Sequence, residues 1–182
     1  TAMEAPKTNV YIDGFNLYYG ALRKTPFRWL DISKLCHLLL PRNDVVSIKY
    51  FAALVRPHPD DAEQPVRQQI YLRALRTLPN VSIVLGHFLS HKVHMPLVKP
   101  TEKERYAHVI KMEEKGSDVN LATHLLCDGY EDAYDVAVVI TNDSDLAAPL
   151  KVIKEKLNKS VGLLNPYKYP SRELMLHSTF FK

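Results

Sequence analysis

Short apolar runs recur along this chain, and each is bounded by polar residues or by glycine and proline. Most positions within a run are apolar, rather than every second position. That continuity is typical of strands buried on both faces of a parallel sheet. The pattern therefore predicts a mainly parallel sheet in the protein interior. The predicted strands are Asn9–Ile12, Ile48–Val55, Val81–Leu85, Val136–Ile140 and Val161–Leu164.

Helical periodicity fills the stretches between these runs. Repeated alternation of strand and helix predicts βαβ units with right-handed crossovers. The expected fold is therefore α/β, a three-layer, doubly wound and mainly parallel sheet. One stretch, from His87 to Glu114, breaks the alternation and predicts a small hairpin-like insertion. The predicted helices run from a cap at Asp31 to about Leu40, from about Pro59 to Leu78, from about Ser117 to Cys127, and from about Asp145 to Leu157.

The 182 residues, with 46% apolar and 24% charged content, predict one globular domain over residues 3–182. Thr1 and Ala2 precede the first methionine and are left out of that domain. The longest wholly apolar run is too short to span a bilayer, so we expect no membrane segment and a cytoplasmic location. We expect Cys36 and Cys127 to be buried, reduced thiols. The net charge of +4 permits a polyanionic partner without demanding one.

Acidic side chains follow two of the predicted strands directly. Asp13 follows the first strand, and Asp143 and Asp145 follow the strand Val136–Ile140. Parallel strands bring their carboxyl ends to one rim, where open α/β sheets bind ligands. Asp118 lies in the first turn of a predicted helix, on the face that points inward. We therefore expect four carboxylates to converge at this rim.

Clustered carboxylates repel one another unless a divalent cation neutralises them. Oxygen ligands suit Mg²⁺ or Mn²⁺, and such an ion activates water for in-line attack on a phosphodiester. Each acid also has a purely structural interpretation, since Asp13 can form a turn and Asp145 can cap a helix. A phosphatase of the haloacid dehalogenase type is disfavoured, because no second acid stands two residues after Asp13.

Three ordered segments resemble motifs of the NYN (LabA-like) family of PIN-like nucleases. Val10–Leu17 (VYIDGFNL) resembles the opening motif, and Glu114–Val119 (EKGSDV) resembles the middle motif. Val139–Leu146 (VITNDSDL) resembles the family's S-G-D-S-D-F motif, with Thr141–Asn142 in place of Ser-Gly and Leu146 in place of the aromatic residue. The resemblance extends over roughly Lys7 to Leu164.

The resemblance implies a PIN-like fold and a ribonuclease that depends on Mg²⁺ or Mn²⁺. Lys115, close before Asp118, and Arg23 are expected to contact the nucleic acid, and Tyr18, Tyr19, Tyr167 and Tyr169 are candidates to stack on unpaired bases. A homodimer or a protein partner is a possible source of specificity. The alternative is a catalytically silent module that binds nucleic acid or regulates. The implied metal ligands are Asp13, Asp118, Asp143 and Asp145, with Asn16 and Ser144 as polar supports.

Overall fold

A seven-stranded sheet organises the protein in the computed structural model, which describes residues 4–57 and 60–182. The strand order is β4-β3-β2-β1-β5-β6-β7, and only β3 and β4 pair antiparallel. From β1 the order proceeds outward in both directions, so the topological switch point lies between β1 and β5. The strands are β1 (Lys7–Asp13), β2 (Asp44–Ala53), β3 (Val81–Pro96), β4 (Tyr106–Lys115), β5 (Val136–Ile140), β6 (Ser160–Leu164) and β7 (Phe180–Phe181).

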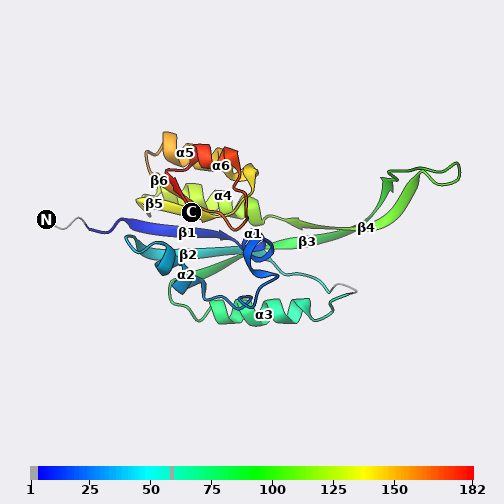
Figure 1. The fold of residues 1–182 in the computed structure, drawn as a ribbon, viewed down its shortest axis with the longest axis horizontal. Helices are drawn as coiled ribbons and strands as arrows, with labels where there is room; N and C mark the ends of the chain where they lie inside the picture. Colours follow the sequence, from blue (N-terminus) through cyan, green and yellow to red (C-terminus); the bar gives the residue numbers. More distant parts are fainter. Residues whose placement is uncertain (1–3, 58–59) are drawn as a thin grey trace.

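Helices cover both faces of the sheet, which confirms the predicted three-layer α/β fold (Figure 1). Apolar residues of α2 and α3 pack in one core cluster, and those of α4, α5 and α6 pack in a second cluster on the opposite face. The helical segments are α1 (Gly14–Leu17), the π-helical η1 (Tyr18–Leu22), α2 (Ile32–Leu39), α3 (Gln64–Leu75), α4 (Ser117–Tyr130), the 3₁₀-helical η2 (Ser144–Leu146), α5 (Ala147–Glu155) and α6 (Arg172–His177).

All five predicted strands are present, and β5 has the predicted bounds. Each of its five residues is buried, as the continuous apolar run indicated. The cap at Asp31 is also confirmed, because its carboxylate accepts a hydrogen bond from the Lys34 backbone N–H at 2.9 Å. The helix expected from Pro59 begins at Gln64 instead. Pro59 itself, and the predicted domain start at Met3, lie outside the described residues.

The helix expected from Asp145 to Leu157 forms in two parts. Its first turn is the 3₁₀ segment η2, and the α-helix α5 begins only at Ala147. The tight turn arises because the Asp143 side chain accepts a hydrogen bond from the Asp145 backbone N–H at 3.0 Å. Asp143 is therefore the capping residue, and the interpretation of Asp145 as the cap is wrong.

The insertion after the third core strand is a long antiparallel ribbon formed by the outer half of β3 and by β4. It pairs from His87 opposite Lys115 to Pro96 opposite Tyr106. Figure 1 shows this ribbon extending well beyond the body of the protein. The predicted hairpin is thus confirmed, although β3 continues into it without a break from the core sheet.

The two cysteines differ in environment. Cys36 is buried on α2 as expected, but Cys127 on α4 is exposed, so the prediction of two buried thiols is wrong for Cys127. The buried face of α4 is formed by Leu121 and Leu125, and a residue two positions beyond Leu125 points to the other side of the helix. Neither thiol is in a disulfide. Within the described ranges, no helix combines the length and apolarity needed to cross a bilayer.

Candidate functional site

Asp13 ends β1 at the carboxyl rim of the sheet and is only 4% exposed. Its carboxylate caps α1 by accepting a hydrogen bond from the Asn16 backbone N–H at 2.9 Å. It also accepts hydrogen bonds from the Asn16 side-chain amide at 2.6 Å and from the Thr141 hydroxyl at 3.1 Å. Burial raises the pKa of Asp13, and these hydrogen bonds partly offset the increase. Local capping and a contact across the switch point therefore hold this acid in place.

A short network joins the loop after β5 to the loop after β1. The Asn16 side-chain oxygen accepts a hydrogen bond from the Asn142 backbone N–H at 3.0 Å. The Thr141 hydroxyl, which donates to Asp13, accepts from the Asp143 backbone N–H at 3.1 Å. The two acidic segments are thus locked to each other through their polar neighbours. Asn16 therefore contacts both segments, and its role as a polar support of a catalytic site stays a prediction.

The loop after β5 presents its two aspartates differently. Asp143 is partly buried and caps η2, whereas Asp145 and Ser144 are exposed. In the part of the chain that the structure describes, the Ser144 hydroxyl makes no hydrogen bond. Its side chain therefore supports none of the acids here, and only its backbone carbonyl contributes, by accepting the Ala147 N–H.

Asp118 reaches the same rim from the start of α4. Gly116 precedes the helix with a φ of 96°, a left-handed conformation that favours glycine. Glu114 caps the helix start, since its carboxylate accepts hydrogen bonds from the Ser117 N–H at 3.1 Å and from the Ser117 hydroxyl at 2.9 Å. This turn directs Asp118 toward the other acids. No group among residues 4–57 and 60–182 donates a hydrogen bond to its carboxylate.

Burial and nearby acids both raise the pKa of the Asp118 carboxyl. Burial, followed by the negative charges of Asp13, Asp143, Glu114 and Asp145 in that order, raises this pKa to about 6. The charged groups that contribute most to this shift are therefore all acids, and their charges add to that of Asp118. Asp13, Asp143, Asp145 and Glu114 thus all act electrostatically on Asp118, and a shared metal site built from the four predicted aspartates stays a prediction.

The donor chemistry of this rim fits a hydrated divalent cation. Among the described residues, no group of three or more histidine, cysteine or acidic side chains stands ready to enclose a metal ion. Mg²⁺ does not require such a cage, since it usually keeps several waters and binds through one or two carboxylates. The negative charges of Asp13 and Asp143 both raise the pKa of Asp118, and a cation bound among these carboxylates would relieve their repulsion.

Residues 7–180 match the model of the NYN domain family. This chain belongs to the NYN family of PIN-like nucleases. The three motifs quoted above, from the strand before Asp13 to the loop before Leu146, lie within the matched range.

Two known proteins resemble this NYN chain. The "6-hydroxy-3-succinoylpyridine 3-monooxygenase HspA" of Pseudomonas putida is 33% identical, over 90% of this chain and 60% of the relative. The NYN chain thus spans less than two thirds of that protein. A solved structure, the "protein of unknown function VPA0982" from Vibrio parahaemolyticus, superposes with a TM-score of 0.62 at 16% identity. The superposition covers all of this chain and 94% of the other, and it supports the fold alone.

The two predicted nucleic-acid contacts lie in different places on the NYN domain. Lys115 ends β4 at the carboxyl rim, half-exposed, with its ammonium group 3.5 Å from a Glu113 oxygen. Arg23 lies beyond η1, with its guanidinium carbon 5.4 Å from the centre of the Tyr19 ring. Lys115 therefore lies at the end of β4, close before α4 and paired with Glu113, whereas Arg23 covers an aromatic ring.

Sequence reasoning missed three residues that build the site. Thr141 and Asn142 were noted only as departures from the family's Ser-Gly, yet Thr141 binds Asp13, and Asn142 binds Asn16 and the Tyr169 carbonyl. Glu114 was quoted as part of a motif but given no role, although it caps α4 and adds a fifth negative charge. No standard capping pattern marked Glu114, because it lies two residues before the N-cap Gly116 and reaches the helix start from outside the helix.

We predict that Gly86→Ala destabilises the domain. A Cβ at Gly86 would lie 2.4 Å from the Lys115 carbonyl oxygen and 2.8 Å from the Glu114 carboxylate, so the start of α4 must shift. Overpacking of this kind costs about 1–3 kcal/mol. Urea unfolding followed by circular dichroism measures the loss, and Ser82→Ala, an exposed position of the same strand, is the control. Equal midpoints for the two variants would contradict the prediction.

Proposed function

We propose that this NYN domain is a metal-dependent ribonuclease that hydrolyses phosphodiester bonds with Mg²⁺ or Mn²⁺. The observation that carries the proposal is the uncompensated negative charge at Asp118, where Asp13, Asp143 and Asp145 converge at the switch point of a PIN-like sheet. Membership of the NYN family supports hydrolase chemistry. The metal and the RNA substrate are part of this proposal, and cleavage and binding assays test both.

Each residue has a distinct task in this proposal. Asp118 and Asp143 hold the cation, Asp145 adds negative charge from the exposed edge, and Asp13 is the most rigid of the acids because three hydrogen bonds hold it. A bound divalent cation would polarise the scissile phosphate and lower the pKa of a water molecule. Asn16 and Thr141 keep the Asp13 carboxylate oriented toward that cation.

The first experiment is an RNA cleavage assay with the native chain. We expect Mn²⁺ to stimulate cleavage of a single-stranded RNA, and Asp13→Asn and Asp143→Asn to abolish it. One observation favours the alternative of a catalytically silent binding module. The Asp13 carboxylate already caps helix α1, so a structural role alone can explain an aspartate at this position. RNA binding with no cleavage at any Mn²⁺ concentration would establish that alternative.

The rim lysine provides a test of how the RNA is held. We expect Lys115→Ala to weaken RNA binding several-fold and to reduce the slope of log affinity against log salt by about one, because one phosphate contact is lost. Lys111→Ala is the matched control, since Lys111 also pairs with Glu113 but lies farther out on the ribbon. Salt titrations with labelled RNA measure both. An unchanged slope for Lys115→Ala would remove this residue from the interface.

The Pseudomonas relative suggests a second candidate, because 33% identity over 90% of this chain is substantial. Oxygenation of 6-hydroxy-3-succinoylpyridine is named for that longer protein. If the activity extends to this chain, calorimetry with 6-hydroxy-3-succinoylpyridine should show saturable binding to the native protein. The absence of any heat of binding would leave the nuclease proposal as the one to pursue.

Substrate choice in this proposal comes from the surface of the domain, a homodimer or a protein partner. We further propose that residues 3–182 act as one domain and that the protein works in the cytoplasm. Sedimentation velocity with and without RNA distinguishes a dimer from a monomer that carries its own specificity.

A further inference from the structure

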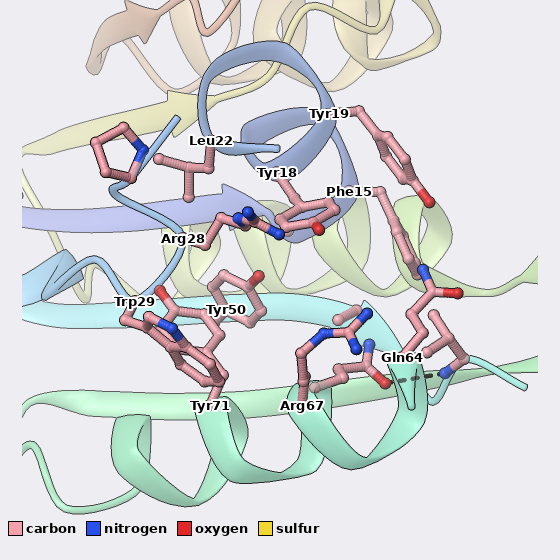
Figure 2. Close-up of a pocket in the computed structure, with 15 residues that line it drawn as sticks. Phe15, Tyr18, Tyr19, Leu22, Arg28, Trp29, Tyr50, Gln64, Arg67 and Tyr71 are labelled. Atoms are coloured by element: carbon pink, nitrogen blue, oxygen red, sulfur yellow. Dashed lines mark hydrogen bonds between the residues drawn. The ribbon is translucent and has the colours of Figure 1, made fainter. Parts of the chain in front are cut away.

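A pocket of about 260 Å³ opens beside the acidic rim, between the segment α1–η1 and helix α3 (Figure 2). Its volume falls below the roughly 300–1,000 Å³ of pockets for larger ligands and suits a single planar ring system. The walls are mostly aromatic, and rings rather than flexible aliphatic chains define its shape. The aromatic residues that line it are Phe15, Tyr18, Tyr19, Trp29, Tyr50 and Tyr71.

The aromatic rings brace one another. Tyr71 meets Tyr50 edge-on at 6.2 Å between ring centres and Trp29 edge-on at 6.3 Å, and its hydroxyl donates to the Leu30 carbonyl at 2.8 Å. Trp29 nevertheless remains 56% exposed, and Tyr19 remains 45% exposed. Two aromatic side chains that are held in place yet open to solvent form a platform on which a base can stack.

Polar groups stand at the same pocket. Gln68 uses both ends of its amide within the wall, donating to the Ala53 carbonyl at 2.8 Å and accepting from the Val55 N–H at 2.9 Å. Gln64 also lines the pocket and reaches up from α3 toward Phe15 (Figure 2). Over the described ranges, neither the Gln64 amide nor the Arg28 guanidinium has a side-chain partner. An amide offers hydrogen bonds to a base edge, and a guanidinium offers charge to a phosphate.

One wall of the pocket begins immediately after Asp13, the acid that ends β1. Gly14 and Phe15, which line it, directly follow Asp13 in the chain. Gly14 permits the close approach, since a Cβ there would lie 2.7 Å from the Tyr50 ring and 2.7 Å from the Phe51 carbonyl oxygen. A polynucleotide with a phosphate at the acids therefore has a neighbouring base within reach of the pocket.

We propose that this pocket receives an unpaired base of single-stranded RNA, adjacent to the phosphate held at the acidic rim. This inference rests on the proposed ribonuclease function. A base can enter an aromatic pocket only when it is neither stacked on its neighbours nor paired with another base. The pocket would therefore select single-stranded over double-stranded RNA.

Trp29 makes the proposal directly measurable, because it is the only tryptophan in the chain. Metal-free native protein is titrated with a single-stranded RNA oligomer and with the same sequence as a duplex. We expect the single strand to quench and shift the Trp29 fluorescence at saturation, and the duplex to leave it unchanged. An oligomer in which one nucleotide after another is made abasic should locate a single position whose loss removes the quenching.

Variants give an independent measurement by anisotropy of labelled RNA. We expect Trp29→Ala and Tyr19→Ala each to weaken binding of the single strand about tenfold. Tyr130→Ala, which removes a tyrosine 65% exposed at the far end of α4, should leave binding unchanged. Neither pocket variant should alter the rise in melting temperature caused by Mn²⁺, because none of these residues touches the acids.

The outcomes separate the two proposals. Single-stranded RNA that binds and is cleaved without changing Trp29 fluorescence, or equal quenching by single and double strands, would overturn the base pocket and leave the nuclease intact. A protein that binds neither RNA would overturn both. Loss of RNA binding in the pocket variants together with a lost Mn²⁺ response would show a general folding defect and count against a specific base contact.

Discussion

Asp118→Asn is expected to lower RNA cleavage at least about 100-fold while leaving the metal-free fold as stable as the native one, or more so. A factor of 100 corresponds to about 2.7 kcal/mol of lost transition-state stabilisation, a modest loss for a metal ligand. The fold should not suffer, because no described residue donates a hydrogen bond to Asp118 and the charges that raise its pKa most are negative. Removing its own charge therefore removes repulsion.

The matched control is Asp128→Asn, the same change near the other end of the same helix. Asp128 is embedded in favourable contacts, since the Lys49 ammonium and the Tyr11 hydroxyl each donate to it at 2.6 Å. Removing the charge from this largely buried pair weakens two hydrogen bonds to a charged group and should cost about 1.5–3 kcal/mol of stability. We expect cleavage by the folded Asp128→Asn protein to stay near the native level.

Cleavage assays and urea unfolding on the same preparations measure both quantities. Activity lost in Asp118→Asn and stability lost in Asp128→Asn would support a site in which repulsion between acids lowers stability but serves catalysis. If Asp118→Asn cleaves RNA at the native rate, the acidic rim is not the catalytic centre.

Mn²⁺ should raise the melting temperature of the native protein by roughly 5–10 °C at pH 7. Ligand at 100 times its dissociation constant contributes about 2.7 kcal/mol, and each kcal/mol shifts the melting temperature by about 2–4 °C in a domain of this size. The effect should be much smaller in Asp143→Asn. Differential scanning fluorimetry measures it, and equal shifts in the native protein and in Asp143→Asn would count heavily against the metal site.

The pH dependence of this effect follows from the direction of the Asp118 pKa shift. Folding raises the pKa of Asp118 to about 6, so the folded state binds its proton more tightly than the unfolded state does. The metal-free protein should therefore lose stability as pH rises from about 4 through 6, where this carboxyl ionises. Burial raises the pKa of Asp13 as well and adds a contribution of the same sign.

A cation reverses this trend, because it stabilises the ionised acids that destabilise the metal-free fold. The Mn²⁺ shift should accordingly shrink at pH 5, where protons compete with the metal for Asp118. In Asp118→Asn the pH slope of the metal-free protein should be shallower between pH 4 and 6. The raised pKa of Asp118 would be contradicted if the Asp118→Asn substitution left the pH slope of the metal-free protein unchanged between pH 4 and 6.

The sequence by itself determined the sheet, its mainly parallel character and the rim at which the acids lie. Strands buried on both faces must be apolar at successive positions, and this local rule marks β5 over its true range, Val136–Ile140. The carboxyl-end rule then assigns Asp13 and Asp143 to one side without any coordinates. The hairpin after His87 was visible for a similar reason, since its pattern interrupts the alternation.

Only the tertiary structure decided which polar neighbours hold the acids and which cavity adjoins them. The Thr141 hydroxyl meets Asp13 across 128 positions of chain, and the Asn142 N–H meets Asn16 across 126. Such contacts depend on strand order and register, which set long-range distances that no local pattern of residues contains. The same reason applies to the aromatic pocket, where Phe15, Tyr50 and Tyr71 meet from three separate elements.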